Sequence, residues 1–512
     1  MAVLPPGISE RDFAAALDEF RDAVGAEWVF SSDEDVALYR DAYSIFWGEP
    51  EERLASAAVA PSTVEEVQAI VRLANARRIP LYPISTGRNL AYGGAAPVLS
   101  GSVVLDLKRM NRVIEVNERN AYALVEPGVS YFDLYNHIEE RGLDLWIDPP
   151  DPGWGSVIGN ALDGGGGWTA YPFRDHFGAH CGMEVVLADG EIVRTGMGAV
   201  PNSKTWQQNK WGYGPWVDGL FRQGNMGIVT KMGFWLMPRP EAYISGTVQV
   251  FNERDIIPLM DTLNLLENQH VVNGSTQLGG GGGFGQGGGG PAWTLQVPIY
   301  GPEKVIRAQL EYAREKFSAI DGARFIESDL IRTPLSPQDR ERVRLVNFGI
   351  PNLSTFSMLG RSPMQPNPPG GHIGFSPIIP RDGEELLKFR DFYRTNLADV
   401  TRGENLGIVG PVFMTNWERS LVALIMFPVF KDAEQNRKIR AAFERWVELA
   451  AANGWAEYRA PTVYQDIISD TYSFNNHALR RLREKIKDAV DPNGILAAGR
   501  YGVWPKHLRE EA

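Results

Sequence analysis

Two glycine-rich stretches in the first third of the chain have the composition of a ligand-binding surface built from main chain. One is Ser85-Thr86-Gly87-Arg88-Asn89, and the other reads GWGSVIGNALDGGGG over residues 153–167. Backbone amides can approach a ligand closely at glycine, and several converging amides can hold a pyrophosphate without a lysine. Neither stretch continues as G-K-[ST], so neither is a Walker A loop. Together they predict a dinucleotide held mostly by main chain, although each alone would also fit a tight turn in a twisted sheet.

Other residues with metal-binding or redox chemistry form no convincing constellation. His176 and His180 are four residues apart, but Gly178 and Gly182 argue against a regular helix there, and no third ligand is evident. We therefore expect no metal site. Cys181 is the one cysteine, which excludes an internal disulfide and suits a small buried side chain.

A later glycine tract satisfies a nucleotide-binding pattern only by its composition. Glycines occupy positions 279–283, 285 and 287–290, which includes G-x-G-x-x-G at Gly280, Gly282 and Gly285. No strand-turn-helix context surrounds it, so a Rossmann interpretation is not favoured. The tract predicts a mobile loop.

The elements that must position the first two stretches alternate between helical and strand patterns. Ser62-Thr63-Val64-Glu65 is a capping signal, and apolar residues follow it at helical spacing. Asp189-Gly190 between two apolar runs predicts a hairpin. The pattern predicts helices over Val64–Arg78, Ser130–Arg141, Glu384–Thr395 and Lys431–Ala452, and strands over Ile79–Ile84, Ser102–Leu107, Ala121–Val125, Val185–Leu187 and Ile192–Arg194.

Bulk composition excludes several kinds of partner. The net charge is −12, and no block of Lys and Arg could neutralise a phosphate backbone, so nucleic acid is not expected. The longest apolar stretch, Leu421–Phe430, is too short for a bilayer, which needs about 20 residues. The first residues, MAVLPPGISERDF, lack the features of a signal peptide. We therefore expect no membrane association and a cytoplasmic protein.

Several long segments, in order, resemble the vanillyl-alcohol oxidase/p-cresol methylhydroxylase family. They include PISTGRNLAYGGAAPVLSGSVVLDL, GSVIGNALD, GMEVVLADGEIVRTGMGA, GGHIGFSPI and DPNGILAAGRYGVWP. The resemblance implies an α+β fold of two domains. A split FAD-binding domain would comprise residues 1–240 and a C-terminal segment, 455–512, that returns to it and to the active site. An α+β cap domain that binds the substrate would span 241–454.

The same resemblance assigns the cofactor site. It implies FAD joined covalently to His372, the histidine of GGHIGFSPI. A covalent link would prevent loss of the flavin and tune its potential. The other residues expected to contact FAD are Ser85, Thr86, Gly87, Arg88, Asn89, Gly155, Ser156, Gly159, Asn160, Gly227, Ile228, Val229 and Arg500.

Catalytic roles also follow from the resemblance. Family members bind the phenolic oxygen of the substrate as a phenolate through two tyrosines and an arginine, which match Tyr92, Tyr458 and Arg459. Ionising a phenol of pKa near 10 at pH 7 costs about 4 kcal/mol. Hydrogen bonds to a charged group contribute about 1.5–3 kcal/mol each, so three can suffice where one cannot. Asp151 matches the carboxylate beside the carbon attached at the para position, from which hydride would leave to flavin N5 and give a quinone methide.

Departures from the family pattern fall on the substrate pocket, for which we expect Trp168, Gly374 and Ser376 as lining residues. Trp168 stands where a tyrosine is usual, and the segment MTNWERSLVAL lacks a usual histidine pair. The substrate class therefore stays open between a para-substituted phenol, a bulkier phenol and a non-phenolic aromatic alcohol.

The leading hypothesis is an oxidase that reduces dioxygen to hydrogen peroxide and acts as a homodimer, the usual assembly in this family. One alternative is a dehydrogenase or hydroxylase that passes electrons to a cytochrome or another acceptor. Another is a non-catalytic, flavin-binding electron-transfer partner, against which the retained Tyr92, Asp151, Tyr458 and Arg459 argue.

Overall fold

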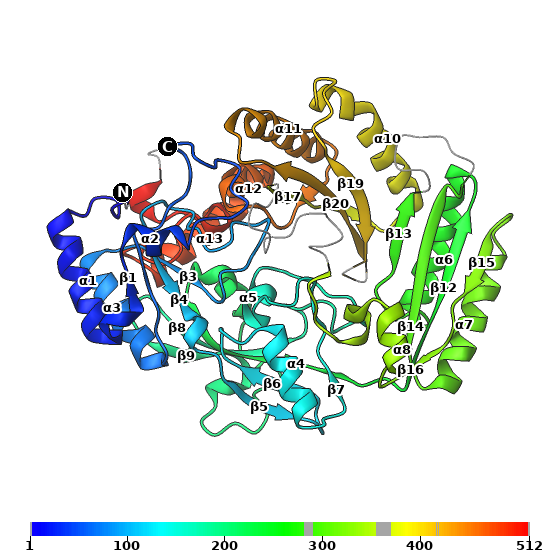
Figure 1. Ribbon diagram of the computed structural model, residues 1–512, viewed down its shortest axis with the longest axis horizontal. Helices are drawn as coiled ribbons and strands as arrows, with labels where there is room; N and C mark the ends of the chain where they lie inside the picture. Colours follow the sequence, from blue (N-terminus) through cyan, green and yellow to red (C-terminus); the bar gives the residue numbers. More distant parts are fainter. Residues whose placement is uncertain (1–2, 281–289, 355–369, 416, 418, 510–512) are drawn as a thin grey trace.

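The structure is a computed structural model that describes residues 3–280, 290–354, 370–415, 417 and 419–509. Two small sheets built from the N-terminal half lie on one side, and one large sheet from the later part lies on the other (Figure 1). The mixture of helix and sheet confirms the α+β class expected from the sequence.

The first sheet carries the loop that begins at Ser85. Its strand order is β1-β2-β4-β3, with β1 antiparallel to β2 and the remaining neighbours parallel. Helices α1 (Glu10–Val24) and α3 (Val64–Arg77) pack against it through a shared apolar core. The short helix α2 (Asp33–Ala37) follows β1 in sequence. The strands are β1 (Val29–Phe30), β2 (Ala57–Val59), β3 (Leu81–Ile84) and β4 (Val103–Asp106).

Helix α3 confirms the prediction made from the capping signal and shows its detail. The N-cap is Thr63, whose hydroxyl accepts from the amide of Glu66, while the amide of Ser62 donates to the Glu66 carboxylate. The helix ends where Arg78 adopts a left-handed conformation. Its buried face consists of Val64, Val67, Ile70, Val71 and Ala74, which each remove apolar surface from water.

The second sheet supports the other glycine-rich stretch. Its order is β5-β6-β10-β8-β9, and all its neighbours are antiparallel. The predicted hairpin is confirmed, although its first strand begins at His180, earlier than expected. Its elements are β5 (Val113–Asn117), β6 (Tyr122–Val125), β8 (His180–Val186), β9 (Ile192–Arg194), β10 (Ile228–Trp235), α4 (Tyr131–Glu140) and α5 (Val157–Leu162). A separate pair joins β7 (Leu145–Trp146) to β11 (Met237–Pro238).

The third sheet belongs to the part between residues 241 and 457. Its main path is β15-β12-β14-β13-β19-β20-β18-β21, with β16 beside β12 and β17 beside β20. The strands are β12 (Ala242–Val250), β13 (Gln277–Gly280), β14 (Trp293–Gly301), β15 (Arg324–Glu327), β16 (Ile331–Arg332), β17 (Gly371–Phe375), β18 (Pro377–Pro380), β19 (Val409–Met414), β20 (Ser420–Val429) and β21 (Ala456–Glu457).

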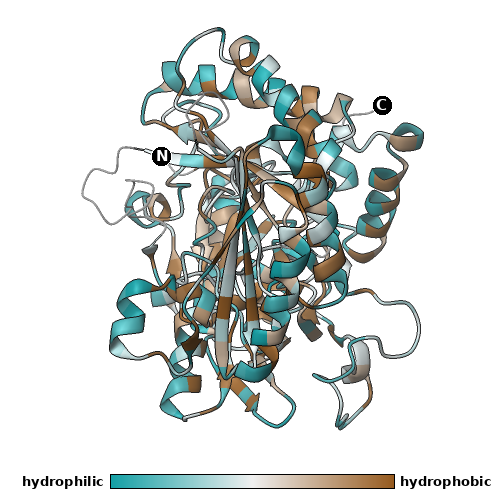
Figure 2. Ribbon diagram, turned by 90° about the vertical axis from the view of Figure 1, so that its right-hand side faces the viewer, coloured by the Kyte–Doolittle hydropathy of each residue, from teal (hydrophilic) through white to brown (hydrophobic). Residues whose placement is uncertain are grey.

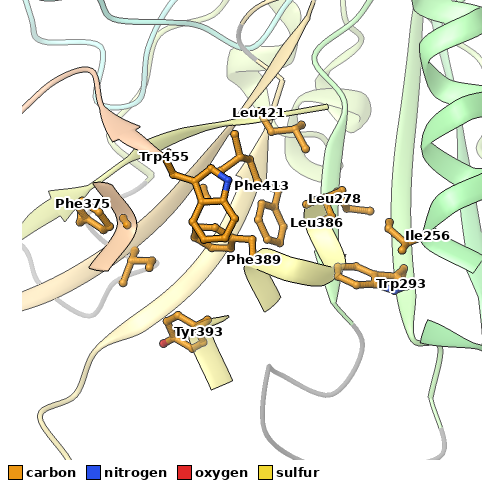
Figure 3. Close-up of a cluster of buried hydrophobic side chains, with 14 of the residues drawn as sticks. Ile256, Leu278, Trp293, Phe375, Leu386, Phe389, Tyr393, Phe413, Leu421 and Trp455 are labelled. Carbon is orange, nitrogen blue, oxygen red and sulfur yellow. The ribbon is translucent and has the colours of Figure 1, made fainter. Parts of the chain in front are cut away.

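Amphipathic helices cover this third sheet. They are α6 (Ile256–Asn268), α7 (Glu303–Ser318), α10 (Gly383–Val400) and α11 (Ala433–Ala452), and a short helix, α8 (Pro337–Arg342), follows β16. Hydrophilic and hydrophobic bands alternate along the helices in Figure 2. Between helices and sheet, aromatic side chains form much of the core, among them Phe389, which lies edge-on to both Phe413 and Trp455 (Figure 3).

The end of the chain returns to the first sheet. After β21, helices α12 (Gln465–Thr471) and α13 (Phe474–Val490) lead back, so the red and blue segments lie together in Figure 1. Leu496 then forms a parallel bridge with Leu81, and the Asn493 amide donates to Asn75. This path brings Arg500 beside the loop at Ser85.

Three details concern stretches singled out in the sequence. Gly279 and Gly280 extend strand β13, so the glycine tract begins inside a sheet, while residues 281–289 lie outside the described part. Leu421–Phe430 is mostly strand β20. Among the described residues, no helix has the length and apolarity to cross a bilayer.

Candidate active site

A cavity lies where the two glycine-rich stretches meet. Twelve of the residues expected to bind FAD line it: Ser85, Thr86, Gly87, Arg88, Asn89, Gly155, Ser156, Gly159, Asn160, Ile228, Val229 and Arg500. Gly227 lies behind this wall, because a Cβ there would meet Val185 and Phe221.

Glycine is required where the two stretches touch. A Cβ on Gly159 would lie 2.2 Å from the Ser85 hydroxyl oxygen, and Gly87 has a φ of +67°. In the described part of the chain, the amides of Thr86, Gly87 and Arg88 donate to no protein acceptor. Unsatisfied donors around a cavity are what an anionic, main-chain-bound ligand requires.

Two side-chain atoms in the cavity wall point to the same kind of ligand. The Arg500 Nε and the Gln223 side-chain oxygen are buried, and neither has a hydrogen-bond partner among the described residues. Buried polar atoms are seldom left unpaired unless a ligand or water completes them. These donors fit the anionic diphosphate of FAD.

His372 lies on β17 in register with Pro428 of β20. Its ring centre is 5.4 Å from that of Tyr43, whose backbone amide donates to Asp41. A Cβ on Gly94, which lines the cavity, would lie 3.5 Å from the Asp41 carboxylate. These contacts lead from His372 to the cavity wall.

Arg459 holds one group of polar residues together. Its Nε donates to Asp163 at 2.6 Å, its Nη2 donates to Asn89 at 2.8 Å, and its guanidinium carbon lies 3.8 Å from the Tyr92 ring centre. Burial lowers the pKa of Arg459, but Asp163, Tyr92 and Tyr458 outweigh it and raise the pKa overall. The arginine is therefore firmly cationic.

Both predicted tyrosines adjoin this arginine. Burial raises the pKa of Tyr92, and Arg459 opposes the rise. Burial also raises the pKa of Tyr458, with Tyr92 adding to the rise and Arg459 opposing it. The two hydroxyls are therefore neutral hydrogen-bond donors at ordinary pH. The structure brings together the three residues that the sequence matched to the phenolate site.

The predicted pocket residues Gly374 and Ser376 lie beside Tyr92. A Cβ on Gly374 would be 3.1 Å from the Tyr92 hydroxyl oxygen and 3.5 Å from the Ser376 hydroxyl oxygen. Any larger residue at position 374 would therefore crowd the tyrosine hydroxyl.

Glu457, which we did not predict, is buried behind the arginine. Its carboxylate accepts from the backbone amides of Ser376, Tyr458 and Arg459. Glu457 therefore links the segment that contains Gly374 and Ser376 to the segment that contains Tyr458 and Arg459. Burial raises the pKa of Glu457 to about 8, against the opposing effect of those amides. One feature of the sequence could have indicated this role, namely the position of Glu457 immediately before Tyr458-Arg459.

Asp163 and Trp417 are two further residues whose importance sequence did not reveal. Asp163 accepts from Arg459 and Asn89 and lies 3.6 Å from the Arg500 guanidinium, so it connects the cofactor cavity to the phenolate residues. Trp417 lies edge-on to Tyr458, with ring centres 4.9 Å apart. It belongs to the segment that departs from the family pattern, where the histidine pair is missing.

Asp151 and Trp168 form a second group. The Ser354 hydroxyl donates to Asp151 at 2.7 Å, and Arg344 lies 3.9 Å from the same carboxylate. The Arg344 guanidinium also stacks 3.6 Å above the Trp168 ring. Trp168 thus makes a cation–π contact that a sequence pattern does not show.

The histidine pair considered for a metal is divided between two environments. The His176 Nδ1 lies 2.5 Å from the Asn160 side-chain oxygen and 3.0 Å from the Tyr131 hydroxyl, whereas the His180 Nε2 lies 2.9 Å from Asp218. Within residues 3–280, 290–354, 370–415, 417 and 419–509, no three His, Cys, Asp or Glu side chains converge on a metal site.

Comparison with known proteins agrees with this geometry. An FAD binding domain model matches residues 55–196. The chain is 34% identical to the 4-cresol dehydrogenase [hydroxylating] flavoprotein subunit of Pseudomonas putida, over 98% of each chain. It is 29% identical to the 1'-carboxy-chondrochloren decarboxylase of Chondromyces crocatus, over 96% of this chain and 98% of that protein.

Solved structures extend the likeness to three dimensions. The 4-ethylphenol oxidase from Gulosibacter chungangensis, in complex with isoeugenol, has a TM-score of 0.86 and 36% identity over 99% of this chain and 100% of that one. Substrate-bound p-cresol methylhydroxylase also has a TM-score of 0.86, with 32% identity over 98% and 99%. The protein is an FAD-dependent oxidoreductase, and the chain belongs to the vanillyl-alcohol oxidase/p-cresol methylhydroxylase family.

Proposed function

We propose that this protein oxidises para-substituted phenols, which it binds as phenolates through Tyr92, Tyr458 and Arg459. The observation that carries the proposal is the contact of Arg459 with Tyr92 and its ion pair with Asp163 on the cavity wall. The names of two relatives, 4-cresol dehydrogenase and 4-ethylphenol oxidase, support this substrate class.

The charges of the site favour an anionic substrate. Arg459 is cationic and pairs with Asp163, which also lies 3.6 Å from Arg500. The pKa of Glu457, at about 8, keeps this acid largely protonated at neutral pH, so it adds little negative charge. A phenolate would accept from the neutral hydroxyls of Tyr92 and Tyr458 and lie beside the Arg459 cation, since buried charges are stable only when paired.

FAD, when bound, would supply the hydride acceptor, and the phenolate oxygen would supply the electron density that lets a hydride depart from the carbon of the para substituent that is attached to the ring. We assign to Asp151 the role of taking a proton from water that attacks that carbon. Ser354 and Arg344 hold the Asp151 carboxylate in one orientation. We also propose that His372 carries the covalent link to FAD, supported by its contacts toward the cavity wall.

Anaerobic mixing of the holoenzyme with matched substrates tests the proposal. We expect 4-ethylphenol to bleach the flavin absorbance and 4-ethylanisole to leave it unchanged, because the methyl ether cannot ionise. Equal bleaching by both compounds would show that no phenolate is needed. No bleaching by any para-substituted phenol would favour a flavin-binding partner without substrate chemistry.

We propose dioxygen as the electron acceptor, in line with the oxidase among the relatives, while the dehydrogenase favours a separate acceptor. Turnover with dioxygen alone, with hydrogen peroxide formed in equal amount to the oxidised phenol, is the expected result. Turnover only after addition of cytochrome c or a dye would favour the alternative. The homodimer, the cytoplasmic location and the domain boundaries stay predictions.

A further inference from the structure

A second cleft, with an empty volume of about 1080 Å³, lies behind the phenolate residues. Its walls come from the segment of residues 219–226, from α12 and α13, and from the C-terminal residues 500–503. Tyr458, Arg459 and Arg500 also line it, so it adjoins the candidate active site.

Arginines dominate the charge of this cleft. Its lining contains Arg222, Arg459, Arg483 and Arg500, against one acid, Glu457. Asp163 pairs with Arg459 and Arg500. Within the described part of the chain, no carboxylate lies within ion-pair distance of Arg222 or Arg483.

Arg222, Arg483 and Tyr501 have N–H or O–H groups that donate no hydrogen bond within the described part of the chain. Arg222 uses two of its N–H groups, one on the Leu162 carbonyl at 3.3 Å and one on the Tyr501 hydroxyl at 3.2 Å. Because Tyr501 accepts this bond, its own proton is available to another acceptor. Arg483 donates to no acceptor among the described residues.

Part of the lining of the cleft is apolar. Leu220, Met226, Ala460, Ile468 and Val503 line it. A ligand that satisfies both parts needs an anionic head and a short apolar body. The planar fork of arginine suits a carboxylate head in particular.

We propose that this cleft is a second binding site, which takes a small organic carboxylate between Arg222, Arg483 and Tyr501. The carboxylate accepts from both guanidinium groups and from the tyrosine hydroxyl, and its apolar chain lies against Leu220 and Ile468. Arg222, Arg483 and Tyr501 are not among the residues proposed to bind the phenolate, although Tyr458 and Arg459 line the same cleft, and the proposal does not depend on phenol oxidation.

Calorimetric titration of the holoenzyme with hexanoate tests the site, since this probe has no aromatic ring for the phenol pocket. Hexanoate should bind, hexanol should bind at least tenfold more weakly, and rising salt should weaken binding. Arg483→Gln should weaken binding about tenfold, the equivalent of one charged hydrogen bond. Arg483→Lys, which retains the charge, should lose less.

Arg481 provides the matched control, because it is an exposed arginine on the same helix and does not line the cleft. Arg481→Gln should bind hexanoate like the unaltered protein. Since Arg483 is exposed, its substitution is compatible with folding, and Arg222→Gln adds a second test from the opposite wall. No binding of hexanoate, equal binding of hexanol, or unchanged affinity in the Arg222→Gln/Arg483→Gln double variant would overturn the proposal. Phenol-dependent flavin bleaching should persist in the Arg483 variants, which separates this test from that of the proposed function.

Discussion

The guanidinium carbon of Arg459 lies 3.8 Å from the centre of the Tyr92 ring, although 367 positions separate the two residues. Tyr92 follows a loop of the first sheet, and Arg459 follows the last strand of the third sheet. Their contact therefore joins the part of the molecule that holds the FAD cavity to the part built on the third sheet. Asp163 and Asn89 fix the guanidinium in this position.

Arg459→Lys should separate charge from geometry. Lysine keeps the positive charge but cannot hold Asp163 and Asn89 in a planar fork while it faces a phenolate. We expect the rate of anaerobic flavin reduction by 4-ethylphenol to fall about 10- to 100-fold, the effect of one or two charged hydrogen bonds. The FAD content, read from the ratio of visible to ultraviolet absorbance, should be unchanged. Arg437→Lys, on the exposed surface of α11, is the control; loss of FAD in Arg459→Lys would point to a structural role.

His372→Ala should leave FAD bound but no longer attached. Alanine retains the strand and removes the nitrogen that the proposed link requires. Acid precipitation should leave the unaltered protein with yellow colour in the pellet and release it to the supernatant in the variant. His507→Ala, at an exposed position near the C-terminus, should behave like the unaltered protein. A pellet that stays yellow in His372→Ala would move the attachment to another residue.

Glu457→Gln should change how stability depends on pH. The pKa of Glu457 rises from 4.5 to about 8 on folding, so the folded protein retains a proton that the unfolded chain has already released. Its contribution to stability is therefore complete below pH 4.5 and is lost as the pH rises to about 8. Glutamine does not titrate, so the variant should lack this part of the dependence of stability on pH.

Thermal unfolding of both proteins across that pH range is the measurement. As the pH rises, the unfolding temperature of the variant should increase relative to that of the unaltered protein. Glu448→Gln, an exposed site on α11, should show no such shift. A constant difference between the Glu457 variant and the unaltered protein would mean that Glu457 is ionised throughout.

Asp151→Asn should slow the step that follows or accompanies loss of hydride. The amide keeps the size of the side chain and can still accept from Ser354, but it cannot take up a proton. General acid–base catalysis contributes about 10²- to 10⁴-fold, so we expect a decrease in turnover within that range. Binding of a phenol that cannot be oxidised, followed by flavin difference spectra, should change little. Asp144→Asn, at a position whose side chain is 86% exposed, is the control; equal turnover in both variants would exclude the role of Asp151.

The sequence by itself determined the local elements and the family. Capping residues and apolar spacing fixed α3, and Asp189-Gly190 fixed the turn between β8 and β9, because these signals act over a few residues. The glycine stretches predicted a main-chain cavity for the same reason, since the absence of a Cβ is a local property.

Only the tertiary structure decided which side chains meet. Asp163, Glu457 and Trp417 have no local signal for their roles, because each acts through a partner contributed by another segment or by a buried environment. The stacking of Arg344 on Trp168 and the facing arginines of the second cleft arise in the same way. Charge pairing and burial depend on distances through space, and the packing of the sheets sets those distances.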